Sequence, residues 1–353
     1  MRKLVIIHTV TPDYRTVFFK NIYNSLQGRF ELYSGDSYFE PTVTSHKTIK
    51  RKRVKNIFLF NRKLLFQKGI WHLVFINDVI VLELNPRIIS NWIFLFVRWV
   101  FNKETYSWGH AWGRKGINSR TDFLRSFMRK LSDGVIVYTN KQKTELQNKM
   151  PQKKIISAPN SLFSRSDMIL SEDEGIREDI ISVCRLVPTK KILFLVKSFM
   201  KGIEKLPINT NLIIVGDGDE KGKIEKFVND HRLTDRVKLL GHISDYNQLK
   251  ELYSKAYFSV SSGYIGLSVT QSFGFGVPML VSKDENHSPE IEAVIAGKNA
   301  VFFKTDDEED FIRKIVKVFE ECNYWNKERK NILELCKENY SSEAMAKVFI
   351  DLV

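Results

Sequence analysis

Two basic side chains, Arg185 and Lys190, stand five residues apart in the segment CRLVPTKK, directly after an apolar run that predicts a β-strand. A guanidinium and an ammonium on one loop suit a diphosphate, because both cations bind phosphate oxygens. The alternative is a pair of surface charges that cap a strand and a helix. We carry Arg185 and Lys190 forward as candidate catalytic residues that stabilise negative charge on a diphosphate.

A second turn, in LIIVGDGDEKG, also follows a predicted strand. Its two glycines, Gly216 and Gly218, are by themselves weak evidence for phosphate binding. Asp217 and Asp219 are more typical of helix capping and turn formation than of metal ligands. The sequence therefore assigns no metal.

A series of spaced motifs follows this turn. LLGHI, LKELYSKA, SSGYIGL and FGFGVP occur in this order, and HSPEI stands at His287–Ile291. Together with CRLVPTK, this string resembles the core of the retaining GT-B glycosyltransferases of the family-4 type, in particular the bacterial surface-polysaccharide glycosyltransferases. The resemblance covers residues 180–300. In the first half it rests on the pattern of elements and on VYTNKQKTEL and KIISAPN, which look like the closing segment of the family's N-terminal domain.

The resemblance implies an enzyme that moves a sugar from a nucleoside-diphosphate sugar to an acceptor hydroxyl with retention and without a metal ion. No side chain stands out as a covalent nucleophile, so we expect attack on the face that the diphosphate leaves. The donor is expected to be UDP-linked, with GDP- or dTDP-linked sugars as alternatives, and no further cofactor is expected. The implied donor-binding residues are His242, Ile243, Gly263, Tyr264, Ile265, Gly266, Leu267, Ser268, Gln271 and Glu290.

The chain departs from this family at two positions. The family has two glutamates eight residues apart, and the matching positions here are Gly263 and Gln271. A glutamine still donates to and accepts from ribose hydroxyls. We expect the sugar contacts to pass to the backbone amides of Tyr264–Ser268, at the start of a predicted helix. A catalytically inactive relative is the alternative, and Glu290 has its own alternative as a carboxylate that offsets a helix dipole.

The first half of the chain supplies the candidate acceptor side. His110 follows a predicted strand in TYSWGHAWGRKG, where a neutral imidazole can accept a hydroxyl proton or hold a sugar hydroxyl. A lone histidine is more often structural. Tyr14 and Arg15, after the first strand, and Arg114 are candidate acceptor-binding residues. Arg15 is alternatively a surface residue at a helix start.

These candidates depend on strands and helices that alternate along the chain, which predicts parallel sheets with crossover helices. The predicted class is α/β, with the GT-B arrangement of two Rossmann-like doubly wound domains that face a central cleft. The polar stretch Asn160–Glu178 reads as a linker. The expected parts are an acceptor-binding domain at 1–165, a donor-binding domain at 166–340, and a helix at 341–353 that packs back toward the first domain.

Charge divides the chain in the same way. Residues 1–165 hold 29 Lys and Arg against 10 Asp and Glu, a net charge of +19, whereas the remainder has a net charge of −5. The basic half indicates an anionic partner. With the aromatic stretches Phe58–Phe66 and Trp92–Phe101 it favours an anionic membrane surface and a lipid-linked or oligosaccharide acceptor. Trp92–Phe101 is alternatively a core helix. Nucleic acid is excluded, because the motifs lie in the acidic half.

No segment is apolar over a full transmembrane length, and the N-terminal stretch reads as a buried strand rather than a signal peptide. Three cysteines without metal-ligand spacing indicate a reducing compartment. We expect a cytoplasmic protein, peripheral on the inner face of the cell membrane, that acts in capsule, O-antigen or exopolysaccharide synthesis. The alternatives are a non-catalytic sugar-nucleotide or membrane-binding relative, and another GT-B enzyme such as a nucleotide-sugar epimerase.

Overall fold

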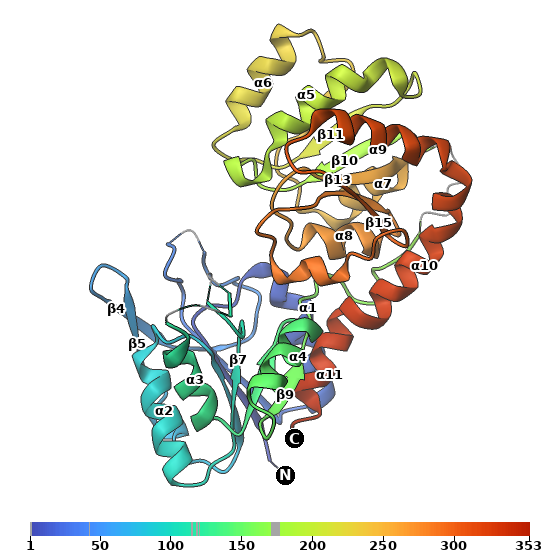
Figure 1. The fold of residues 1–353 in the computed structure, drawn as a ribbon. Helices are drawn as coiled ribbons and strands as arrows, with labels where there is room; N and C mark the ends of the chain where they lie inside the picture. Colours follow the sequence, from blue (N-terminus) through green and yellow to red (C-terminus); the bar gives the residue numbers. More distant parts are fainter. Residues whose placement is uncertain (1, 42, 114–115, 118, 120, 171–176) are drawn as a thin grey trace. The chain divides into compact units, whose positions relative to one another are not determined.

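The computed structural model describes residues 2–41, 43–113, 116–117, 119, 121–170 and 177–353. It divides into two compact units, Met1–Leu162 with Tyr340–Val353, and Phe163–Asn339. The sequence predicts these boundaries at 165/166 and 340/341. Each unit is described below by itself (Figure 1).

The first unit is built on a seven-stranded sheet in the order β3-β2-β1-β6-β7-β8-β9, in which every neighbouring pair is parallel. The direction of strand addition reverses between β1 and β6, as in doubly wound folds. A separate antiparallel hairpin joins β4 and β5. The strands are β1 (Leu4–His8), β2 (Phe30–Ser34), β3 (Lys52–Arg53), β4 (Lys55–Leu59), β5 (Leu64–Lys68), β6 (Val79–Glu83), β7 (Thr105–Trp108), β8 (Gly134–Val137) and β9 (Lys154–Ser157).

This sheet is buried on both faces. In β1, Val5 and Ile7 pack into one hydrophobic cluster, whereas Leu4 and Ile6 pack into another on the opposite face. The alternation follows from the two-residue repeat of a strand. Helices cover both faces: α1 (Thr16–Leu26), α2 (Ile89–Val100), α3 (Asp122–Leu131) and α4 (Asn140–Lys149).

The last helix, α11 (Ser342–Ile350), belongs to the first unit and packs against α1. Met345 and Phe349 are fully buried in the same cluster as Phe18 and Trp108. The Phe349 ring lies 4.7 Å from the Trp108 ring, centroid to centroid. The core of the first unit is therefore completed by residues far away in the sequence.

The second unit contains a six-stranded parallel sheet in the order β12-β11-β10-β13-β14-β15, and its strand order reverses between β10 and β13. Both sheets thus confirm the predicted α/β class with two Rossmann-like doubly wound domains. The strands are β10 (Asp179–Val183), β11 (Leu212–Val215), β12 (Val237–Leu239), β13 (Ala256–Ser261), β14 (Met279–Ser282) and β15 (Ala300–Phe303).

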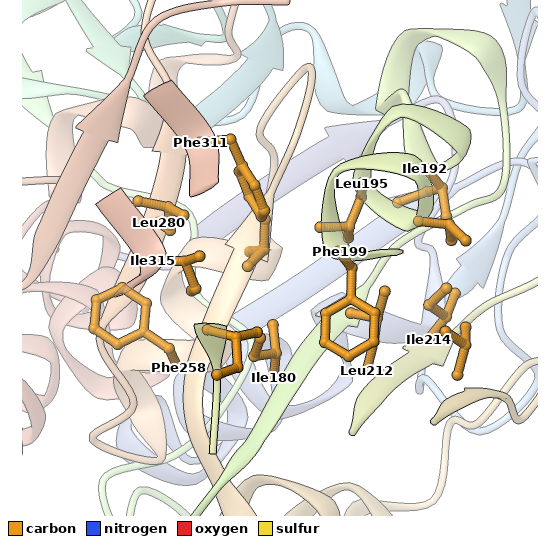
Figure 2. Packing of buried hydrophobic residues seen from close by; sticks show 14 of the residues in the cluster. Ile180, Ile192, Leu195, Phe199, Leu212, Ile214, Phe258, Leu280, Phe311 and Ile315 are labelled. Carbon is orange, nitrogen blue, oxygen red and sulfur yellow. The ribbon is translucent and has the colours of Figure 1, made fainter. Parts of the chain in front are cut away.

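Helices of the second unit bury apolar side chains on this sheet. Figure 2 shows Ile192, Leu195 and Phe199 of one helix beside Leu212 and Ile214 of β11, all in one hydrophobic cluster. Residues three and four apart lie on one face of a helix, which explains this spacing. The helices are α5 (Ile192–Gly202), α6 (Lys221–Asp230), α7 (Tyr246–Lys255), α8 (Ser268–Gly274), α9 (Glu308–Glu320) and α10 (Cys322–Tyr340). Among the described residues no helix is long and apolar enough to cross a membrane.

One buried cation, Arg98, fixes the position of α2. Its side chain is fully buried, and burial lowers the pKa of its guanidinium to about 10, so it stays charged at neutral pH. Nε donates to the Thr105 hydroxyl at 2.7 Å. The two terminal nitrogens donate to five backbone carbonyls, those of Leu73, Val74, Ile76, Asp78 and Glu104.

Because Arg98 satisfies five carbonyls that water cannot reach easily, we expect Arg98→Met to lower the free energy of unfolding of the first unit by about 4 kcal/mol. Five of the six tryptophans lie in this unit, so denaturant unfolding followed by tryptophan fluorescence reports on it. The exposed Lys130→Met on α3 is the control, with an expected change below about 0.5 kcal/mol. Equal stabilities of the two variants would contradict this role of Arg98.

Candidate functional site

The candidate diphosphate-binding loop lies where the strand order of the second sheet reverses. Arg185 and Lys190 follow β10, and the SSGYIGL loop follows its neighbour β13. In parallel α/β sheets the carboxyl ends of such neighbouring strands form a crevice that binds ligands. The two loops that carry the sequence motifs therefore lie side by side within one unit.

The glycine pair Gly216 and Gly218 supports the Arg185 loop. Both have φ angles near +150°, and a Cβ on Gly216 would lie 1.8 Å from the Cys184 carbonyl oxygen. The Leu186 amide donates to the Asp217 carbonyl at 2.8 Å, which ties the two turns together. The glycines thus allow a close approach of two backbones. This packing role accounts for a pattern that the sequence analysis treated as weak evidence for phosphate.

Asp217 is used within its own turn. Its carboxylate accepts from the Gly218 amide at 2.8 Å and pairs with Lys221. The Gly218 amide and Lys221 lower the pKa of this carboxyl. In the part of the chain that the structure describes, no three His, Cys, Asp or Glu side chains are grouped as metal ligands would be.

The two cations have different surroundings. Arg185 is exposed, and its guanidinium makes no hydrogen bond or ion pair with any other described residue. Lys190 is partly buried, and its Nζ donates to the Tyr264 carbonyl at 2.6 Å and lies 4.9 Å from the Tyr264 ring centroid. Burial lowers the pKa of Lys190. Lys190 thus links the β10 loop to the β13 loop, while Arg185 is available to a ligand.

Gly263 stands where the two loops touch. A Cβ at this position would lie 2.3 Å from the Thr189 carbonyl oxygen and 3.0 Å from the Lys190 carbonyl carbon. The Tyr264 amide donates to the same Thr189 carbonyl at 2.8 Å, and the Ser262 hydroxyl donates to the Lys190 carbonyl at 2.8 Å. Position 263 therefore has no space for a side chain, so the family's glutamate cannot stand here without a shift of the backbone.

His287 holds the next residue of the loop and was not among the predicted site residues. Its Nδ1 accepts from the Ile265 amide at 3.1 Å, and its Nε2 donates to the Ser282 carbonyl at 2.8 Å. These two bonds define a neutral imidazole with the proton on Nε2. Burial lowers its pKa below the ordinary 6.5, which agrees with that state. The signal in the sequence is the HSPEI motif itself, from which only Glu290 had been selected.

The amides of the SSGYIGL loop divide into two groups. Those of Tyr264 and Ile265 are occupied by Thr189 and His287. The amides of Gly266, Leu267 and Ser268 donate to no other residue in the described part of the chain, as is usual at the start of a helix. The predicted set of five available amides is thus reduced to three.

Gln271, on α8, is 9% exposed, and its carboxamide makes no hydrogen bond with another described residue. Glu290 lies in a short 3-10 helix, Pro289–Ala293, close enough to Lys190 to affect the pKa of that amine. His242 is exposed and Ile243 partly exposed in the loop after β12. An electrostatic effect of His242 on Asp217 places it beside the glycine turn. The donor-side predictions thus fall on neighbouring loops of one unit.

The acceptor-side predictions lie in the first unit. His110 is exposed directly after β7, with its ring 4.7 Å from the Tyr138 ring. Tyr14 is also exposed. Arg114 lies outside the described residues.

Arg15 is not the surface residue that the sequence offered as an alternative. It is 4% exposed and donates to Asn160 at 2.6 Å and to the Met345 sulfur of α11 at 3.0 Å. Its guanidinium also lies 5.0 Å from the Trp108 ring centroid. Both terminal nitrogens thus have partners inside the first unit, which favours a structural role.

A polar cluster that the sequence analysis missed lies where the first sheet reverses. Glu83, the last residue of β6, accepts from the Thr9 amide at 2.6 Å, from the Thr9 hydroxyl at 2.8 Å, and pairs with His8 Nδ1. Burial alone would raise the pKa of Glu83, but His8 and Thr9 outweigh it and lower that pKa. His8 Nε2 is buried without a partner in the described residues. The sequence signal for this cluster is the polar residues at the ends of β1 and β6, which had been interpreted only as parts of buried strands.

Comparison with known proteins identifies the second unit. Residues 170–334 match the family "Glycosyl transferases group 1". The matched stretch contains all the donor-side residues described above.

Two relatives match the chain over similar lengths. The α-monoglucosyldiacylglycerol synthase of Acholeplasma laidlawii is 24% identical over 206 residues, which are 55% of this chain and 49% of the synthase. An uncharacterised glycosyltransferase of Methanocaldococcus jannaschii is 31% identical over 215 residues, which are 55% of this chain and 51% of that protein. The chain spans about half the length of these curated relatives.

Solved structures match the whole fold. HepE of Anabaena, solved in complex with UDP, superposes with a TM-score of 0.73 at 13% identity and covers 100% of this chain and 99% of HepE. The solved structures that this chain resembles are GT-B glycosyltransferases. The likeness confirms the GT-B fold class predicted from the sequence.

We expect Gly263→Ala to destabilise the second unit by about 2 kcal/mol, because the added Cβ would lie 2.3 Å from a backbone carbonyl oxygen, so that the backbone must shift. Thermal unfolding measures the effect. Gly266→Ala in the same loop is the matched control, since its nearest neighbours lie 4.0 Å away. If both variants unfold at the same temperature, the close contact at Gly263 does not constrain the loop.

We also expect the SSGYIGL loop to loosen as the pH falls from 7 to 5. The pKa of His287 is lower in the folded protein than its ordinary 6.5, so the unfolded state binds more protons and stability is lost below pH 6.5. Protonation of Nδ1 removes the acceptor for the Ile265 amide. Hydrogen exchange of that amide, corrected for its intrinsic pH dependence, should speed up in the native protein. His287→Asn keeps an acceptor but does not titrate, and an identical pH response in this variant would refute the role of His287.

Proposed function

We propose that this protein transfers a sugar from a nucleoside-diphosphate sugar to an acceptor hydroxyl, with retention of anomeric configuration. The observation that carries the proposal is the junction of the Arg185–Lys190 loop with the SSGYIGL loop at the reversal point of the second sheet, inside a glycosyltransferase group 1 domain. An exposed guanidinium that pairs with no other described residue, beside a partly buried ammonium, suits a diphosphate.

In this proposal the two cations act when the bond from the anomeric carbon to the β-phosphate oxygen breaks. Negative charge then develops on the diphosphate, and Arg185 and Lys190 stabilise it. The acceptor oxygen bonds to the same carbon from the face that the diphosphate leaves, and its proton passes to the departing phosphate oxygen. Arg185 and Lys190 supply the positive charge, so we propose that no metal ion is needed. Retention without a covalent intermediate agrees with a loop that has no carboxylate at position 263.

Two further donor contacts come from groups that make no hydrogen bond with another described residue. The amides of Gly266–Ser268 suit phosphate or sugar oxygens, and the Gln271 carboxamide suits the ribose hydroxyls. Because HepE was solved with UDP, we propose a UDP-linked donor, with GDP- and dTDP-linked sugars as the alternatives to test. His242 and Ile243 would border the base, and Glu290 would bind the sugar.

We propose a lipid-linked oligosaccharide as the acceptor, in capsule, O-antigen or exopolysaccharide synthesis, and a location on the inner face of the cell membrane. Support comes from the net charge of +19 in residues 1–165 and from a relative whose name describes a diacylglycerol glycolipid. His110 and Tyr14 are the acceptor-side candidates.

A second candidate is a relative that binds a sugar nucleotide without turnover. The observation that favours it is the close packing at Gly263, which excludes the family's first glutamate. The two candidates share donor binding and differ in turnover. An epimerase would need acidic groups beside the sugar, and Glu290 is the one carboxylate assigned there.

The test uses Arg185→Ala. We expect it to lower the turnover of the preferred donor by about 100-fold or more, because a charge contact made in the transition state is lost. UDP-glucose, UDP-N-acetylglucosamine, GDP-mannose and dTDP-glucose are first screened by thermal shift, and nucleotide release is then measured with the best donor. Arg313→Ala, an exposed arginine on α9, is the control with normal turnover.

The outcomes separate the candidates. Stabilisation by a nucleotide sugar without nucleotide release, in the presence of lipid-linked oligosaccharide, selects the non-catalytic relative. No stabilisation by any of the four donors, or normal turnover of Arg185→Ala, overturns the assignment of the diphosphate site.

A further inference from the structure

Helix α2 of the first unit is apolar on two sides. Its inner side buries Phe94 and Leu95 in the core. Its outer side leaves Ile93, Phe96 and Trp99 exposed, with Trp99 58% exposed, although such residues are normally buried. A surface helix of a water-exposed protein carries polar residues on that side. The outer side of α2 therefore needs a partner other than water.

The exposed residues of α2 extend into a larger apolar face. Phe75 and Phe101 are both exposed, and their rings contact each other at 5.2 Å. On α3, which packs against α2, Phe123 and Phe127 are exposed four residues apart. The Phe127 ring stacks on Trp92 of α2 at 6.1 Å. We call this set the aromatic face; it consists of Phe75, Ile93, Phe96, Trp99, Val100, Phe101, Phe123 and Phe127.

Arg98 keeps the aromatic face turned outward. Its guanidinium is fully buried and hydrogen-bonded to five carbonyls, as described above, so α2 cannot rotate to bury Trp99 instead. The neighbouring positions Trp99 and Val100 must then remain on the outside. The exposure of this face is thus built into the packing of the first unit.

The net charge of the sequence segment that carries α2 and α3 indicates what covers the aromatic face. Residues 85–132 contain nine Lys and Arg against two Asp and Glu, a net charge of +7. Both carboxylates are occupied, because Glu104 pairs with Arg2 and Asp122 pairs with Arg129 and Lys149. Lys130 is exposed on the same side of α3 as Phe127, three residues away. A second copy of the chain would bring like charges together, whereas an anionic bilayer would neutralise them.

The dimensions agree with a helix that lies along a membrane. α2 has 12 residues, so it is about 18 Å long and cannot span a hydrocarbon core of about 30 Å. Tryptophan and phenylalanine beside lysine are typical of helices that enter the boundary between headgroups and acyl chains.

We propose that the aromatic face is the membrane-docking surface of this protein and that it inserts into the interfacial layer of a bilayer rich in anionic phospholipid. This inference rests on the proposed function and specifies which residues of the protein would contact the membrane. The docking itself is independent of donor binding, because the residues involved belong to a different unit.

The test measures sedimentation of the full chain with vesicles of phosphatidylcholine that contain 30% phosphatidylglycerol. Trp99→Ser and Phe96→Ser are each expected to lower the partition coefficient about tenfold, because each removes one large apolar side chain from the bilayer. Lys130→Gln is expected to lower it about fivefold on anionic vesicles and not at all on pure phosphatidylcholine. Ile208→Ser, at an 82% exposed position of the second unit, is the control with unchanged binding.

Each outcome is decisive. Wild-type partition of both Trp99→Ser and Phe96→Ser overturns the proposal. A second copy of the chain covers the aromatic face instead if two results are found together. The wild-type protein does not bind vesicles and is a dimer, and Trp99→Ser converts this dimer to a monomer. Circular dichroism confirms that the variants are folded. If Trp99→Ser does not fold, Phe96→Ser is used in its place.

A thermal shift with the nucleotide sugars above should be unchanged in these variants. If nucleotide sugars do not shift the unfolding temperature of the wild-type protein, the proposed function is refuted and the docking result is unaffected.

Discussion

The second unit depends on one close contact between backbones. The loops after β10 and β13 touch at Gly263, whose α-carbon faces the Thr189 carbonyl without space for a methyl group. This contact aligns the Tyr264 carbonyl with the Lys190 ammonium and leaves the next amides in line for His287 and for a ligand. Arg185 is held from the other side by the Gly216 turn. The candidate site is therefore supported by two close backbone contacts, at Gly263 and Gly216, and by the side chains of Lys190 and His287.

The pattern of the sequence predicted much of this architecture. The apolar runs Ile180–Cys184 and Asn211–Val215 predicted two strands, which the structure has as Asp179–Val183 and Leu212–Val215. The motifs that follow such strands predicted where the donor loops lie. β2 was missed, because its sequence FELYS places Glu31 within the apolar run. The β4–β5 hairpin and α10 were also missed, since neither has a strong apolar period. His287 and the pair of His8 and Glu83 were missed because their roles depend on partners 22 and 75 residues away, which no local pattern reveals.

The aromatic face illustrates a different limit of sequence analysis. The run WIFLFVRWVF was read both as a membrane contact and as a core helix, and composition could not separate the two. The structure divides the run, because Phe94 and Leu95 are buried as in a core helix while Phe96 and Trp99 are exposed. Arg98 makes this division possible, since a charge in an apolar helix is tolerated only where it finds hydrogen-bond acceptors. Arg98 interrupts the apolar run in the sequence, and in the structure it fixes the orientation of the helix that contains the run.

The packing of α11 has a consequence for the order in which the protein forms during translation. Residues 163–339 are continuous, so the second unit can fold as soon as they have left the ribosome. The first unit, whose strands emerge earlier, lacks Met345 and Phe349 until the ribosome has passed residue 349. Until then the faces of Phe18 and Trp108 that α11 covers are open to water or to a chaperone. The domain that begins the chain is thus the later of the two to be completed.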